Sequence, residues 1–295
     1  MYIREILATI NLAHHFDSAF TPEQAYRFLR VAMARDHFRQ KLAELKQAGL
    51  VEETDGALFT RNLQAQYRRK QEWSRALFQR HRGYLRLIAK LPWIKFAALT
   101  GANAFESCAD QDDIDLFLVT RKNRLWISYV LLVLYSKLIR KRHILCINYL
   151  VDEKNLCATR QDYYTAVQII QMVPLLNHEF AQKILAGNRW IFEVLPNAEA
   201  EVISDESYHL DNGHHAVPGS DKQQRSQETH FFLDRLNRFI YRRYARHLAQ
   251  KYPGQFGEGI VLTEGLAKLN RVDHRDIYEE IYQKIYRELE TTDAL

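Results

Sequence analysis

The stretch AALTGANAFESCADQDDIDLFLVT, from Ala97 to Thr120, constrains the fold more than any other part of the chain. An apolar run ends at Gly101, and a second one begins where Asp113 and Asp115 flank an isoleucine. Because alternate side chains of a strand lie on one face, the two carboxylates point the same way. We therefore expect two strands joined through a glycine turn, with a paired-carboxylate site for a divalent metal ion and phosphate.

The first sixty residues predict a small helical unit that ends in a hairpin. Thr21 and Gln24 supply a capping box around Pro22, and Asp36 is expected to cap a third helix that stops at Gly49. Two short strands follow around an Asp-Gly turn. The expected elements are helices over 3–14, from 22, and over 36–48, then strands over 50–53 and 57–59. Three helices and a hairpin are the order of a winged helix.

The third helix of this unit would expose Arg39, Lys41 and Lys46, the positions that meet DNA in winged helices. Asp36 and Glu44 lie on the same helix and lower its positive potential. A DNA-binding role and a structural or protein-contact role both remain open for this unit.

The rest of the chain alternates between helical and strand patterns in a way that predicts an α+β protein. Beyond the N-terminal hairpin, strands are expected only in the middle of the chain, and the segment after Tyr163 is expected to be helical, with interruptions at Pro174 and near Gly187. The last part predicts amphipathic helices whose tyrosines pack between helices. The expected middle elements are a basic helix over 64–91, a strand, glycine turn, helix and strand over 94–119, a helix over 124–140 and a strand over 144–151.

Positive charge gathers in two clusters, although the formal net charge is only +5. Residues 61–95 hold ten Lys or Arg against the single acid Glu72, and a second cluster spans Arg235 to Lys251. Such faces attract nucleic acid and nucleotide phosphates. A solvated helix face is the simpler alternative for each cluster.

Cysteine content and hydropathy predict a reduced, cytoplasmic setting without a membrane span. The three cysteines, Cys108, Cys146 and Cys157, show no CxxC spacing. The most apolar segment, 125–139, is shorter than the roughly 20 residues that a membrane span needs. The first residues carry charges too early for a signal peptide.

The glycine turn and the paired aspartates resemble the nucleotidyltransferase superfamily, which shares its catalytic fold with DNA polymerase beta. Its signature is an apolar strand ending in Gly-Ser or Gly-Gly and, about ten residues later, Asp-x-Asp or Asp-x-Glu. Here the motif stands as Leu99-Thr100-Gly101-Ala102 and Asp113-Ile114-Asp115. The chain is also similar to uncharacterised bacterial nucleotidyltransferase-domain proteins with an N-terminal winged-helix-like region. The segments that carry this likeness are Asn123–Trp126, Cys146–Tyr149, Tyr164–Ala166, Asn188–Ile191 and Leu195–Asn197.

The resemblance implies an α+β fold, with a nucleotidyltransferase-like mixed sheet and helices preceded by a winged-helix-like unit and followed by a helical C-terminal region. Together with the patterns along the chain, it predicts a winged-helix-like unit (1–62), a long basic connecting helix (63–92), a nucleotidyltransferase-like α/β core (93–160), a helical extension (161–197), a mobile linker (198–227) and a C-terminal helical region (228–295).

The resemblance also implies a metal-dependent enzyme that moves an NMP from an NTP to an unidentified acceptor, which can be a small molecule, a protein or RNA. Asp113 and Asp115 would be the catalytic residues and would ligate Mg²⁺, with room for two ions. The nucleotide would contact Gly101, Ala102, Asn103, Arg124 and Asn148.

Three departures from the family pattern support an alternative, a catalytically weakened nucleotide- or nucleic-acid-binding winged-helix protein. Ala102 stands where the superfamily usually has Ser, and a lost hydrogen bond to phosphate costs roughly 1.5–3 kcal/mol. Asn148 stands where a third carboxylate is usual, and Gln168 where the similar bacterial proteins tend to have Glu. The last two changes lower the negative charge of the expected site.

Overall fold

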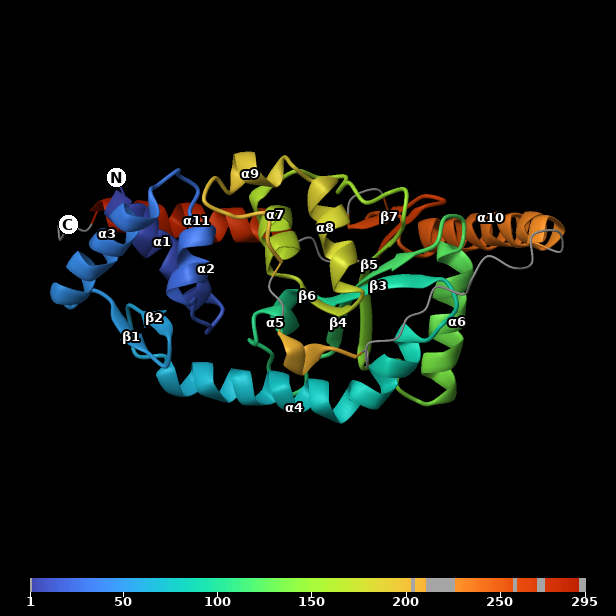
Figure 1. Ribbon diagram of the computed structural model, residues 1–295, viewed down its shortest axis with the longest axis horizontal. Coiled ribbons are helices and arrows are strands. Elements are labelled where there is room, and N and C mark those ends of the chain that lie inside the picture. The colour runs from blue at the N-terminus through green and yellow to red at the C-terminus, as the bar shows by residue number, and fades with distance from the viewer. Residues whose placement is uncertain (1, 203–204, 211–225, 257–258, 270–273, 292–295) are drawn as a thin grey trace.

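The computed structural model describes residues 2–202, 205–210, 226–256, 259–269 and 274–291. These residues form an α+β protein with eleven α-helices, one short 3-10 helix, a two-stranded hairpin and a six-stranded mixed sheet (Figure 1). None of the described helices is both long and apolar enough to cross a membrane.

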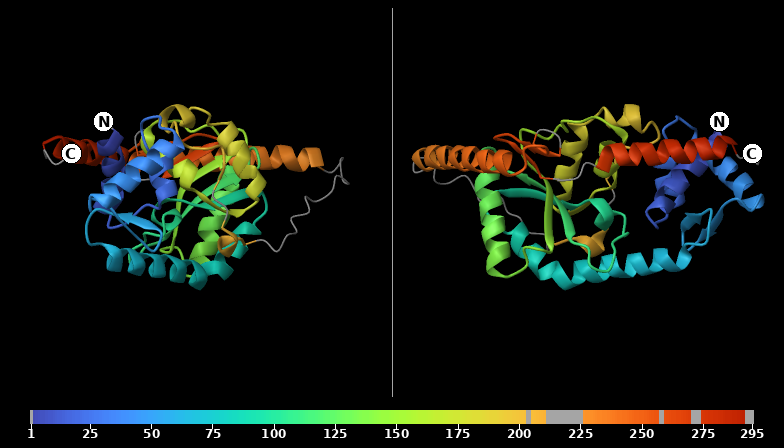
Figure 2. Two further views of the ribbon diagram at one scale, coloured as in Figure 1. Left: turned by 60° about the vertical axis from the view of Figure 1, so that its left-hand side comes forward. Right: turned by 180° about the vertical axis from the view of Figure 1, so that it is seen from behind.

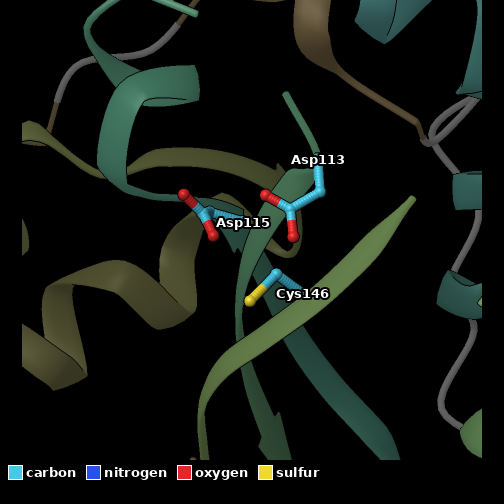
Figure 3. A group of neighbouring side chains, drawn as sticks. All are labelled: Asp113, Asp115 and Cys146. Carbon is cyan, nitrogen blue, oxygen red and sulfur yellow. The ribbon is translucent and has the colours of Figure 1, made fainter. Parts of the chain in front are cut away.

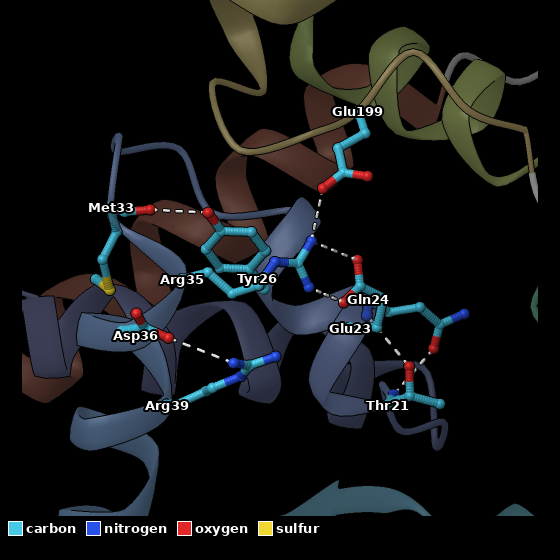
Figure 4. Close-up of polar contacts among 9 residues, drawn as sticks. All are labelled: Thr21, Glu23, Gln24, Tyr26, Met33, Arg35, Asp36, Arg39 and Glu199. Carbon is cyan, nitrogen blue, oxygen red and sulfur yellow. Dashed lines mark hydrogen bonds and ion pairs between the residues drawn. The ribbon is translucent and has the colours of Figure 1, made fainter.

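The N-terminal unit has the predicted order of three helices and a hairpin. Its elements are α1 (Tyr2–His15), α2 (Pro22–Arg27), α3 (Arg35–Gln47), β1 (Glu52–Thr54) and β2 (Ala57–Phe59). The capping box is confirmed, because the Gln24 N–H donates to the Thr21 hydroxyl and the Thr21 N–H donates to the Gln24 side chain (Figure 4). The predicted cap at Asp36 is wrong. Ala34 precedes α3 without a side-chain cap, and Asp36 pairs with Arg39 one turn along.

The middle of the chain also follows the predicted order. Its elements are α4 (Gln64–Ala89), β3 (Ile94–Leu99), α5 (Gly101–Ala104), β4 (Ile114–Thr120), α6 (Leu125–Leu138) and β5 (Leu145–Asp152). Helix α4 runs from the hairpin to the sheet along one side of the molecule (Figure 1). β4 is antiparallel to β3 and parallel to β5, so the start of β4 lies between the glycine turn and the start of β5.

The prediction that strands occur only in the middle of the chain is wrong. The later elements are α7 (Tyr163–Gln171), β6 (Val173–Leu176), α8 (His178–Ala186), α9 (Ile191–Val194), a 3-10 turn (Glu206–Tyr208), α10 (Ser226–Lys251), β7 (Ile260–Leu262), β8 (Leu266–Leu269) and α11 (His274–Thr291). The sheet order is β6-β3-β4-β5-β8-β7. Pro174 does not interrupt this sheet, because β6 is an edge strand and an edge tolerates a missing N–H. β7 and β8 have only three and four residues, so neither gives a strand pattern in the sequence that is long enough to recognise.

Alternation along β4 divides the core between the two faces of the sheet. Leu116 and Leu118 belong to a cluster that includes residues of α4, α6 and α10. Phe117 and Val119 belong to a second cluster, with side chains of α8. A strand that is apolar on both faces reads as a continuous apolar run, which is why this segment stands out in the sequence.

The C-terminal helix α11 packs against α1 and α7. It lies at the opposite end of the molecule from α10 (Figure 2). Tyr282 is buried there, and on α10 Tyr244 packs against Trp126, so the expected helix-packing role of these tyrosines is confirmed. Much of the predicted linker over 198–227 lies outside the described residues. Its described part includes Tyr208 and Leu210, which are buried in the core beside the sheet.

Candidate functional site

The turn after β3 brings its backbone against the Asp115 carboxylate. Gly101 has a φ of +57°, in the left-handed region that favours glycine. A Cβ at this position would lie 2.5 Å from Asp115 Oδ2, so no side chain fits there without displacing the carboxylate. Two independent requirements, one conformational and one steric, therefore explain the glycine in the motif.

Asp113, Asp115 and Cys146 converge in front of this turn (Figure 3). One oxygen of each carboxylate and the Cys146 sulfur all lie within 4.8 Å of one another. Asp115 and Cys146 are register partners on the parallel strands β4 and β5, so the sheet itself holds the two side chains at the same level. Two carboxylates and a sulfur in this arrangement can hold a divalent cation.

Burial and mutual proximity shift the pKa values of this cluster. Burial is the main factor that raises the pKa of the Asp113 carboxyl above its ordinary value. Burial, followed by the charges of Asp115 and Asp113, raises the pKa of the Cys146 thiol to about 12. A cation bound between these groups would favour the charged forms that burial disfavours.

The expected third position on β5, Asn148, is not the one in register with the aspartates. The pairing of β4 with β5 is irregular between Ile147 and Tyr149, so Asn148 lies at the irregularity. Its side chain lies outside what the structure describes. Cys146 was missed as a candidate, although it stands second in its strand, as Asp115 does, and adjacent parallel strands that start together align such positions.

The cluster opens into a cavity of about 960 Å³ that is lined from several parts of the chain. The glycine turn and the strand ends form one wall, and residues of α7, of α10, of β8 and of the segment after β5 form the others. Basic side chains line much of it: Arg142, His143, Arg160, His247, Lys251 and Lys268. These basic side chains share the cavity with the two aspartates and give it a positive surface that suits a polyanion.

Of the three predicted nucleotide contacts at the turn, two lie at this cavity, and Asn103 is not among the lining residues. Gly101 and Ala102 both line the cavity. The Gly101 N–H donates to Gln168 Oε1 at 2.9 Å, so a phosphate would have to displace this side chain to use that amide. Asn103 is buried, and its side chain donates to the backbone oxygen of Asp113 at 3.0 Å, which anchors the approach to β4.

Arg124, a predicted nucleotide contact, lies away from this cavity. It follows the far end of β4, whereas Asp113 precedes the strand and Asp115 stands near its start, and it is not among the residues that line the cavity. Its side chain is buried and forms an ion pair with Asp234 of α10. The structure thus gives Arg124 a place between α6 and α10, away from the paired carboxylates.

The cations of α3 are paired with acids. Figure 4 shows the pair between Arg39 and Asp36, whose atoms are 3.3 Å apart. Lys41 pairs with Glu44 and Lys46 with Glu53, and Arg35 at the start of the helix pairs with both Glu23 and Glu199. Each pair lowers the net positive potential that this helix would present to DNA.

Comparisons with protein-family models, with curated proteins and with solved structures find no match for this chain. The side chains and geometry of the site itself are therefore the basis for proposing a function.

Proposed function

We propose that this protein is a metal-dependent nucleotidyltransferase, which moves an NMP from an NTP to an acceptor. The observation that carries the proposal is the meeting of Asp113, Asp115 and the Gly101 turn at the wall of a cavity lined by basic side chains. Carboxylates suit a divalent cation, and the basic side chains suit the triphosphate.

Acidic and basic residues of the cavity would have different roles. Asp113 and Asp115 would hold the divalent cation, which when bound neutralises phosphate charge and favours ionisation of the acceptor hydroxyl. Basic groups such as Arg160 and Lys251 would bind the outer phosphates. The acceptor oxygen would form a bond to the α-phosphorus as the bond to the bridging oxygen breaks, which releases pyrophosphate; the acceptor's proton passes to water.

The size of the cavity supports a substrate larger than a metal ion. A volume of about 960 Å³ lies at the upper end of the range of roughly 300–1,000 Å³ for small-molecule sites. Such a volume accommodates a nucleotide together with the reacting part of an acceptor. Helix α10 contributes Tyr244, His247 and Lys251 to the lining, so the C-terminal part of the chain is expected to help bind one of the substrates.

The first experiment measures metal-dependent nucleotide binding by calorimetry, followed by release of pyrophosphate from each NTP, with Mg²⁺, Mn²⁺, Co²⁺ or Zn²⁺. Asp113→Asn and Asp115→Asn remove a negative charge with little change in shape and should abolish both signals. Asp110→Asn is the matched control, because Asp110 is exposed on the preceding loop and does not line the cavity. Unmutated protein that binds no NTP in the presence of any of these four metals would refute the proposal.

A nucleotide-binding protein without transfer activity is the second candidate. The contact between Gln168 and the Gly101 N–H favours it, because it occupies an amide that phosphate would otherwise use. Persistent metal-dependent nucleotide binding without pyrophosphate release, across small-molecule, protein and RNA acceptors, would favour this candidate. Nucleic-acid affinity that falls steeply with salt and survives both aspartate substitutions would instead indicate a nucleic-acid-binding role.

A further inference from the structure

We propose that Cys146 is the third protein ligand of the cation site and that the Asp113–Asp115–Cys146 centre prefers a thiophilic divalent ion of the Zn²⁺ or Co²⁺ type over Mg²⁺. The inference rests on the proposed function in one respect, namely that a divalent cation binds between the two aspartates. It adds the identity of the third ligand and the class of metal.

The geometry already brings the three donors close to the spacing that one ion needs. Zn²⁺ binds sulfur at about 2.3 Å and carboxylate oxygen at about 2.0–2.2 Å, so donors around one tetrahedral ion lie roughly 3.3–3.8 Å apart. The three donor atoms here all lie within 4.8 Å of one another. A movement of about 1 Å, within the reach of side-chain rotation, would complete the coordination.

The sheet fixes Cys146 in this position. Leu145 and Ile147, its neighbours on β5, are buried, whereas Cys146 is partly exposed and stands in register with Asp115. A shift of β5 by one residue would exchange these environments, so the register is strongly specified. Cys146 therefore faces the site because of the sheet register rather than through a movable loop.

The donor set does not match the preference of Mg²⁺. Mg²⁺ demands oxygen ligands in octahedral geometry and keeps several waters, whereas thiolate sulfur favours softer ions. Three protein ligands also leave a fourth position open, which is the arrangement of catalytic rather than structural zinc sites. When the metal–sulfur bond forms, the thiol proton is released to solvent, so the step balances without any oxidant or reductant.

The test is a titration of the full-length protein with Co²⁺ in the absence of nucleotide, followed by absorption spectroscopy. We expect a near-ultraviolet sulfur-to-cobalt charge-transfer band together with visible d–d bands. In Cys146→Ser the charge-transfer band should vanish, and the affinity for Co²⁺ and Zn²⁺ should fall by at least about tenfold. Cys157→Ser is the matched control and should keep the band, because Cys157 is exposed and outside the cluster.

A second measurement covers the case in which Cys146→Ser folds poorly. In the unmutated protein, saturating Zn²⁺ should protect Cys146, but not Cys157, from alkylation, as measured by mass spectrometry, and excess Mg²⁺ should not. The inference is overturned if Co²⁺ gives d–d bands without the charge-transfer band, if the band survives Cys146→Ser, or if Mg²⁺ protects as well as Zn²⁺. Because no nucleotide is present, these outcomes are independent of the nucleotide-binding assay. Loss of NTP binding with an intact sulfur–cobalt band would contradict the proposed function alone.

Discussion

The Asp115 carboxylate occupies the space that a side chain at position 101 would need, 2.5 Å from the place where a Cβ would lie. Gly101 also adopts a φ of +57°, so the residue is required by its own backbone and by its neighbour. This contact joins the end of β3 to the start of β4. It couples the shape of the turn to the position of the Asp115 carboxylate, a proposed metal ligand.

Substitution of Gly101 by alanine should disturb both folding and the site. The left-handed backbone should cost about 1–2 kcal/mol of unfolding free energy, and the added methyl should displace Asp115 and weaken metal binding. Gly83→Ala is the control, since Gly83 lies within α4 with open space around it. That change should stabilise the protein by roughly 0.5–1 kcal/mol. Urea denaturation and Co²⁺ titration check both effects; equal behaviour of the two variants would contradict the role of the contact.

Neutralising a basic residue of the cavity should weaken nucleotide binding in a salt-dependent way. Arg160 and Lys251 both line the cavity and are exposed, so each is expected to contribute about 1 kcal/mol, or roughly a fivefold change in Kd. Arg160→Gln and Lys251→Gln should show this change most clearly at low ionic strength. Arg242→Gln, on the exposed surface of α10 and outside the cavity lining, should leave the Kd unchanged. Calorimetry with an NTP at two salt concentrations distinguishes these outcomes.

The buried His14 should make the free energy of unfolding fall at mildly acidic pH, because its ring takes up a proton more readily in the unfolded chain than in the folded protein. Burial lowers the pKa of His14 from 6.5 to about 4, and its ring nitrogens contact Thr60 and the Leu58 carbonyl. The unfolded chain therefore takes up a proton below pH 6.5 that the folded protein refuses until about pH 4. The stabilisation is complete above pH 6.5 and is lost as the pH falls toward 4.

The measurable consequence is a difference in pH dependence between variants. Between pH 7 and pH 5 the protein should lose on the order of 2 kcal/mol more unfolding free energy than His14→Gln, which has no titrating ring. His15→Gln, at an exposed neighbouring position, should retain the behaviour of the unmutated protein. Parallel curves for the protein and for His14→Gln would show that His14 is not the group responsible.

Arg30 should link the C-terminal helix to the rest of the molecule. Its guanidinium lies 3.9 Å from the Tyr163 ring centre and 3.6 Å from that of Tyr282, and it pairs with Glu279 at 2.8 Å. Arg30→Met should lower the unfolding free energy by about 2 kcal/mol, and Arg30→Lys should recover only part, since an ammonium group cannot stack on both rings as a planar group does. Arg39→Met, at an exposed pair, should change it by less than about 0.5 kcal/mol. A similar loss for the two methionine variants would contradict the link.

Local signals account for the parts of the fold that were predictable. The capping box at Thr21, the Asp-Gly hairpin and the apolar period of β4 depend on residues close together in the chain, and each element formed where expected. The cap expected at Asp36 is wrong because α3 begins at Arg35, so the N-cap position falls on Ala34. The same apolar pattern allows the helix to begin one or two residues earlier or later. The edge strand β6 was missed because Pro174 is read as a helix break unless the pairing of its neighbours is known.

The sequence by itself indicated that the Asp113 and Asp115 carboxylates lie close together and that a glycine turn precedes them, because these are local properties of neighbouring residues. The structure places Asp115 on β4 and Asp113 just before that strand. Only the tertiary structure decided that Cys146, rather than Asn148, stands level with Asp115, because the register between two strands depends on the packing of both. It also decided that Lys251 and Lys268 reach the cavity whereas Arg124 does not. Those placements follow from how α10 and β8 pack on the sheet, and contacts between such distant segments leave no periodic signal in the chain.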